Sequence, residues 1–301
     1  MTTRSVTSFV VPEIKMSLLR DLLSLTKPRL SSLVIFTCAL GLFLAPGEIS
    51  LFRALISVLA TSGLVGGACA INCVMEKDID ALMERTKNRP LPSGRVSSEL
   101  ALSLGVGVVI SCLVTLFFVV NPLTAMLGSI ATLTYVFLYT PLKKKTSWAL
   151  FAGAIPGALP PLMGWTSVTN SLGTLGLVLF AILFIWQLPH FLSIAIYYND
   201  DYKAANLKTH PGHIGILPTL HRIAVYTLIL MLVSLAPYWV GATTEGYRNI
   251  VFLLGGAFFI FSLMGYSMKP ESKELMQWAR RYFYSSIIYL PCVFVLMLLF
   301  R

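Results

Sequence analysis

Apolar stretches of about twenty residues alternate with short polar segments along nearly the whole chain. A helix needs about 20 apolar residues to cross the ~30 Å hydrocarbon core of a bilayer. Nine stretches meet this requirement: 28–46, 53–75, 97–120, 122–140, 147–167, 172–196, 218–240, 250–268 and 282–300. The third and fourth are separated only by Val120-Asn121-Pro122, which predicts a tight helical hairpin. The pattern therefore predicts an all-α, polytopic membrane protein, a bundle of nine transmembrane helices.

The composition supports this fold class and indicates which kinds of molecule the protein binds. Of 301 residues, 56% are hydrophobic and only 12% are charged, which is typical of a membrane protein and not of a soluble core. The net charge of +10 lies mostly in short loops between apolar stretches, so we expect the lipid bilayer as partner and no nucleic acid. The five cysteines show no paired spacing, which excludes a disulfide framework and a zinc site.

The basic residues predict an orientation. With the N-terminus in the cytoplasm, all but three of the 23 Lys and Arg residues fall on the inner side, the exceptions being Arg53, Arg248 and Arg301. Residues 1–27 lack a long apolar core and contain acidic residues, so we expect neither a signal peptide nor a mitochondrial transit peptide. They instead form a cytoplasmic segment with a short amphipathic helix at 16–26, ahead of a single transmembrane domain over 28–301. A bacterial inner membrane fits best.

The candidate chemistry is concentrated in residues 72–95. Asn72, Glu76 and Asp80 are spaced i, i+4, i+8, which places them within about 80° of one helical face. An amide and two carboxylates on one face suit Mg²⁺, which shares its coordination with phosphate oxygens. Arg85 and Arg89 follow and are natural bidentate partners for a diphosphate. A merely solvated loop would also carry charges but gives no reason for this acidic face.

Two further inner loops carry charge. Lys143 begins a run of three lysines, and Asp200 and Asp201 follow the sixth apolar stretch. Two acidic clusters on one side of the membrane suggest two metal sites flanking a polyphosphate, with the active site on the cytoplasmic side.

The membrane interior has its own candidate features. Pro156, Pro160 and Pro161 predict a broken helix that lines an internal chamber, with a merely kinked helix as the alternative. His190 lies near the inner end of its helix, where an ionisable group faces the bundle interior either as a site residue or as a hydrogen-bonded packing residue. His210 and His213 form an H-x-x-H pair that we interpret as a loop feature.

Together these motifs resemble the signature of UbiA-type intramembrane prenyltransferases, and within them the protohaem IX farnesyltransferase (haem O synthase) branch. The resemblance covers residues 22–300. It rests on Asn72-xxx-Glu76-xxx-Asp80 with the following Arg85-Thr86-Lys87-Asn88-Arg89-Pro90, and on Trp186-Gln187-Leu188-Pro189-His190-Phe191. Supporting pieces are Lys27-Pro28-Arg29, Tyr139-Thr140-Pro141-Leu142-Lys143, 157–165 and Asp201-Tyr202.

The resemblance implies a nine-helix bundle that alkylates carbon. Farnesyl diphosphate would lose diphosphate, the 2-vinyl group of haem b would attack the allylic cation, and water would complete the product, haem O. The implied Mg²⁺ ligands are Asn72, Glu76, Asp80 and Asp201, with Asp200 as the alternative to Asp201. Diphosphate contacts would come from Lys27, Arg85, Arg89 and Lys143, where the two arginines alternatively hold haem propionates. His190 and Trp186 would lie on the haem side, and haem A synthase or a terminal oxidase would be a downstream partner.

Two departures from the family pattern stand out. Glu76 replaces the usual Asp, and the second motif reads Tyr197-xxx-Asp201 where Asp-xxx-Asp is common. Rival interpretations are a quinone or chlorophyll prenyltransferase, a transporter, and an inactive assembly factor. The concentration of acids and bases on one side of the membrane argues against a transporter.

Overall fold

The computed structural model describes residues 11–270 and 272–301, which form helices and, within these ranges, no β-strand. The predicted all-α class is confirmed. The first ten residues of the predicted N-terminal segment lie outside the described residues.

The elements follow one another in the order below. They are α1 Val11–Leu25, α2 Pro28–Leu44, α3 Leu51–Met75, α4 Lys77–Leu82, α5 Ser98–Thr115, η1 Leu116–Val120, α6 Pro122–Leu133, η2 Thr134–Tyr139, α7 Thr140–Leu142, α8 Ala149–Thr169, α9 Thr174–Tyr197, α10 Asn199–Ala204, α11 His210–Ile214, α12 Ile216–Ser234, α13 Ala236–Trp239, α14 Glu245–Leu263, η3 Met264–Ser267 and α15 Lys273–Leu299.

Each of the nine predicted stretches coincides with a helix or with helices joined end to end. Seven helical spans among the described residues are long and apolar enough to cross a membrane, which makes the chain a multi-pass membrane protein. The other two stretches are α2, with 17 residues, and α8, which contains three prolines and is mostly buried. The count of nine spans stays a prediction.

Two elements differ from expectation. Helix α8 is continuous through Pro156, Pro160 and Pro161, so the predicted break is wrong. Its packing between α2 and α9 holds it helical although the prolines remove backbone donors. Helix α15 begins at Lys273 instead of residue 282. The Ser272 side chain caps this end, and residues 273–281 mix charged with apolar residues and so fall outside the apolar pattern.

Glycines bring the helices around α8 into backbone contact. A Cβ atom at Gly164 would overlap the carbonyl oxygen of Cys38 on α2, and one at Gly41 would overlap that of Pro161 on α8. A Cβ at Gly67 on α3 would lie 2.8 Å from the carbonyl oxygen of Gly105 on α5. Small residues therefore set the spacing of α2, α3, α5 and α8.

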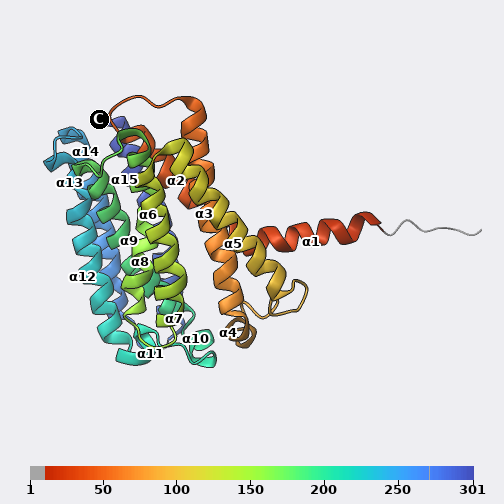
Figure 1. The fold of residues 1–301 in the computed structure, drawn as a ribbon. Helices are drawn as coiled ribbons and strands as arrows, with labels where there is room; N and C mark the ends of the chain where they lie inside the picture. Colours follow the sequence, from red (N-terminus) through yellow and green to blue (C-terminus); the bar gives the residue numbers. More distant parts are fainter. Residues whose placement is uncertain (1–10, 271) are drawn as a thin grey trace, which may run out of the picture.

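The long helices form one bundle, with α4, α7, α10 and α11 gathered at one end and the C-terminus at the other (Figure 1). The three inner loops singled out from the sequence thus lie at the same end. Helix α1 projects away from the bundle across the direction of the long helices (Figure 1), and it exposes Leu18, Leu19 and Leu23. An apolar face on such a helix fits an interfacial position at the membrane surface.

Candidate active site

Asn72 is the centre of a buried polar cluster in the last turn of α3. Its side chain is 1% exposed. Its Oδ1 accepts hydrogen bonds from Lys27 Nζ at 2.8 Å and from the Tyr135 hydroxyl at 3.2 Å, while its Nδ2 donates to Thr140 Oγ1 at 3.0 Å. These bonds fix the amide so that its oxygen faces the positive charge of Lys27.

Glu76 and Asp80 continue the acidic face beyond the end of α3. The helix is interrupted at Glu76, yet Glu76 N still donates to Asn72 O and Asp80 N to Glu76 O, so the i, i+4 register persists into α4. Both side chains are buried, at 4% and 3% exposure. The predicted single face is therefore retained across two helices.

Each of these buried carboxylates has a basic partner. Lys143 Nζ lies 2.8 Å from Glu76 Oε1, in an ion pair without an aligned hydrogen bond, and Arg89 Nη1 lies 2.8 Å from Asp80 Oδ2. Burial lowers the pKa of Lys143, but Tyr139 and Glu76 outweigh that effect and hold the pKa above its ordinary value. The two carboxylates are thus shielded from water, whereas their basic partners Arg89 and Lys143 remain partly exposed.

The backbone of Lys27 is unusual. This residue precedes Pro28 and adopts a left-handed conformation, with φ at 50° and ψ at 67°. A non-glycine residue in this region carries backbone strain, and such strain concentrates at functional sites. The residue in this left-handed backbone conformation is the same one whose side chain donates a hydrogen bond to Asn72.

The loop after α4 is anchored to the core, which positions Arg89. Leu91 and Val96 are buried in a cluster with Leu25 and Ala70. Thr86, fully buried, donates from its hydroxyl to the Asp80 carbonyl at 2.7 Å. The charged loop is therefore a packed structure and not a solvated connection.

Other predicted residues stand apart from this cluster. Arg85 is exposed and stacks over the Tyr198 ring, with its Cζ 5.0 Å from the ring centre. Asp200 is exposed and Asp201 half-buried on α10. Among the described residues no group of three or more His, Cys, Asp or Glu side chains is arranged to hold a metal, so Asp201 does not complete such a group with Glu76 and Asp80.

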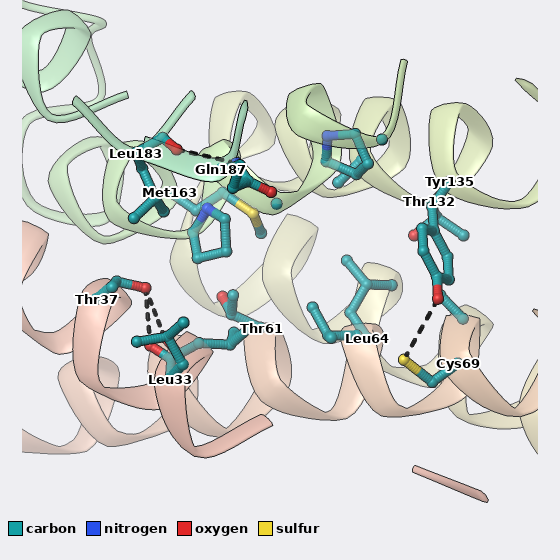
Figure 2. A pocket seen from close by; sticks show the side chains of 18 of the residues that line it. Leu33, Thr37, Thr61, Leu64, Cys69, Thr132, Tyr135, Met163, Leu183 and Gln187 are labelled. Atoms are coloured by element: carbon teal, nitrogen blue, oxygen red, sulfur yellow. Dashed lines mark hydrogen bonds between the residues drawn. The ribbon is translucent and has the colours of Figure 1, made fainter. Parts of the chain in front are cut away.

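An apolar chamber of about 160 Å³ extends from this cluster into the membrane region. Figure 2 shows Tyr135 and Cys69 at one end of the chamber and Thr37 and Met163 toward the other. Helices α2, α3, α6, α8 and α9 all contribute to its lining, including Pro156 and Pro160 of α8. The predicted chamber is present, although the helix that lines it is unbroken.

His190 and Trp186 line this chamber, on the side of α9. The two rings stack with centroids 4.5 Å apart, and the His190 Nδ1 lies 2.7 Å from Ser286 Oγ on α15. Ser286 already donates its hydroxyl hydrogen to the Phe283 carbonyl at 2.6 Å. Nδ1 must therefore carry the proton, and the Nε2 lone pair stays free for another partner.

Sequence reasoning missed three residues that shape the site. Tyr135 lies one turn before the Tyr139-Thr140 motif and was recognisable as a neighbour of it, and Thr140 belongs to that motif. Ser286 offered no sequence signal, because only tertiary packing brings α15 to α9.

Comparisons with known proteins identify relatives of this chain. The model of the UbiA prenyltransferase family matches residues 34–287. A protoheme IX farnesyltransferase of Anaeromyxobacter dehalogenans is 45% identical over 283 residues, covering 94% of each chain, and one of Anaeromyxobacter sp. is 47% identical over 280 residues, covering 93% of each.

The fold is also similar to solved structures. A UbiA homologue from Archaeoglobus fulgidus, bound to GPP and Mg²⁺, has a TM-score of 0.67 at 16% identity, over 92% of this chain and 99% of that chain. A structure concerned with digeranylgeranylglyceryl phosphate synthase in membranes has a TM-score of 0.76 at 16% identity, over 93% and 97%. At such low sequence identity, these two structures support the fold and not the function. The buried acidic motif, the adjoining chamber and the match over most of its length together show that this chain belongs to the UbiA prenyltransferase family.

Proposed function

We propose that the chain is a prenyltransferase that makes haem O. It transfers the farnesyl group of farnesyl diphosphate to the 2-vinyl group of haem b, with addition of water and release of diphosphate. The observation that carries this proposal is the 45–47% identity to protoheme IX farnesyltransferases over more than nine-tenths of both chains.

The donor set fits Mg²⁺. The Asn72 amide oxygen and the Glu76 and Asp80 carboxylates are hard oxygen donors on one face, and Glu76 Oε1 is buried without an aligned hydrogen bond. Asn72, Glu76 and Asp80 would hold the metal, with Asp201 or Asp200 as a further ligand on the α10 side. When bound, Mg²⁺ would neutralise charge on the leaving diphosphate. The UbiA homologue of Archaeoglobus fulgidus was solved with Mg²⁺ and GPP, which supports this assignment.

The basic side chains then have a defined task. Lys27, Lys143 and Arg89 are held in place by the acidic motif and would turn their donors to the diphosphate oxygens, and Arg85 would approach from Tyr198. This stabilises the charge that develops as the bond between farnesyl C1 and oxygen breaks, the electron pair leaving with diphosphate.

The chamber performs the second half of the reaction. Its apolar wall, of which the Tyr135 side chain forms part, keeps bulk water from the allylic cation. The vinyl carbon of haem b forms the new bond to farnesyl C1. One water then adds to the resulting cation on the porphyrin side chain and loses a proton, which gives the hydroxyethylfarnesyl group.

His190 and Trp186 belong to the haem side of this scheme. A neutral imidazole with a free Nε2 is suited to ligate haem iron or to contact the macrocycle. Haem A synthase or a terminal oxidase would consume the product. The bacterial inner membrane, with the site toward the cytoplasm, is the location that the distribution of basic residues favours.

Turnover by the purified chain tests the proposal. Farnesyl diphosphate, haem b and Mg²⁺ should yield haem O, identified by its mass and its retention on reversed-phase chromatography. Parallel reactions with an aromatic acid or a chlorophyllide as acceptor should stay at background. Prenylation of one of those acceptors in place of haem would refute the assignment and leave only the family.

A further inference from the structure

A second cavity, of about 130 Å³, lies beside the chamber at the inner ends of α8 and α9. The segment before α8, the last turns of α9 and the segment between α10 and α11 supply its walls. Phe191 lines both cavities, and it follows His190 directly. The second cavity is therefore next to the haem side of the chamber and one helical turn closer to the loops.

The polar lining of this cavity is basic. Lys143 and Lys208 contribute positive charge, Ser147 and Thr209 contribute hydroxyls, and the lining contains no Asp or Glu. Lys143 is paired with Glu76, whereas within residues 11–270 and 272–301 no ion pair is described for the exposed Lys208. The remaining wall is apolar and includes Leu192 and Leu150 of α9 and α8. A cavity of this kind suits an anion carried by an apolar body.

His210 points to a missing partner. It lines the cavity, is only 3% exposed, and its Nε2 is buried without a hydrogen bond among the described residues. A buried nitrogen without a partner is costly, and a ligand oxygen that accepts a hydrogen bond from Nε2–H, in the tautomer that protonates this nitrogen, removes that cost. Burial, and after it the nearby Arg222 and His213, lowers the pKa of His210 to about 4, so the imidazole of His210 is neutral at physiological pH.

We propose that this second cavity binds the propionate carboxylates of haem, through Lys208, His210 and the adjoining hydroxyls. The inference rests on the proposed function. Haem carries its propionates and its 2-vinyl group on opposite sides of the macrocycle, so propionates held here leave the vinyl side to the chamber past Phe191. Arg85 and Arg89 then bind the diphosphate, and they are not needed as ligands of the propionates.

Removing the charge from the ligand tests the proposal. Haem b and its dimethyl ester are titrated by absorbance into the purified full-length chain, into Lys208→Ala and into His210→Gln, which keeps a polar side chain of similar size. Lys145→Ala is the matched control, since Lys145 is an exposed lysine of the same end that does not line the cavity. The Michaelis constant for farnesyl diphosphate is measured for every variant.

The wild-type chain should prefer haem b over the dimethyl ester by at least about tenfold, or about 1.4 kcal/mol. This preference should fall below about threefold in both cavity variants and persist in Lys145→Ala, with the farnesyl diphosphate constant unchanged. A preference that survives in both cavity variants, or that the wild type lacks, overturns the proposal. So does a rise in the farnesyl diphosphate constant alone, which would make the cavity a diphosphate site. Wild-type protein that forms no haem O would instead refute the proposed function.

Discussion

Asp80 and Glu76 are each paired with a basic side chain, and both carboxylates are ligands in the proposed metal site. This arrangement stores cations and anions at one spot before any substrate arrives, with little exposed surface. In the proposed reaction, a diphosphate and its metal would exchange partners with these pairs without ordering new side chains, so the site would be preorganised.

The metal assignment predicts a steep dependence on Asp80. Asp80→Ala removes a ligand oxygen and leaves Arg89 without its partner, so kcat should fall at least about a hundredfold at fixed Mg²⁺. Initial rates and the Mg²⁺ concentration for half-maximal activity measure this, with folding monitored by thermal unfolding. Glu76→Asp should stay within about tenfold of wild type, because a carboxylate remains. Full activity of folded Asp80→Ala would show that this carboxylate is no ligand.

The tautomer of His190 leads to a separate prediction. Ser286→Ala removes the hydroxyl oxygen that accepts the hydrogen bond from Nδ1–H. The imidazole of His190 can then adopt either tautomer, so Nε2 no longer has to keep a free lone pair. The absorbance spectrum of bound haem b should shift and haem affinity should weaken about threefold to tenfold, while farnesyl diphosphate affinity changes by less than about threefold. Ser286→Thr keeps the hydroxyl and is expected to restore the spectrum. An unaltered spectrum in Ser286→Ala would separate His190 from the haem.

At the scale of elements, periodicity predicted the helices well and their interruptions poorly. Helix positions follow from local hydropathy, so all nine stretches coincide with helices. The face shared by Asn72, Glu76 and Asp80 was predictable for the same local reason. By contrast, the continuity of α8 through three prolines and the partner of His190 depend on neighbours far away in sequence, which a single sequence does not reveal. The position of Asp201 relative to Glu76 depends on such contacts too.

The contact between α2 and α8 predicts which glycines matter. Gly164→Ala forces a methyl group against the Cys38 backbone carbonyl, and overpacking of this kind costs about 1–3 kcal/mol. Gly107→Ala is the control, since a Cβ there meets nothing within 4 Å and alanine favours a helix. Thermal unfolding in detergent should show a lower midpoint for the first variant and no decrease for the second. Equal midpoints would mean that α2 and α8 separate without cost.

At the scale of the whole molecule, charge and apolar surface are segregated along the bundle. The acidic and basic cluster lies at the end that holds α4, α7, α10 and α11 (Figure 1), and the chamber extends from it between the helices. A substrate with a charged head and an apolar tail matches this division. Since a diphosphate would enter from water on one side only, the orientation of the bundle decides which compartment supplies it.

The two ends of α8 offer a direct test of that orientation. Lys145 precedes this helix and Ser171 follows it, and both side chains are exposed. The excess of basic residues at the Lys145 end predicts that this end faces the cytoplasm. In intact bacterial cells a membrane-impermeant maleimide should label Ser171→Cys and should label Lys145→Cys only after permeabilisation. Cys38, Cys69 and Cys73 are buried. The chain without either substitution is labelled in parallel, and its labelling is the background that arises from native cysteines. Labelling of Lys145→Cys in intact cells, with Ser171→Cys protected, would invert the bundle and place the diphosphate site outside the cytoplasm.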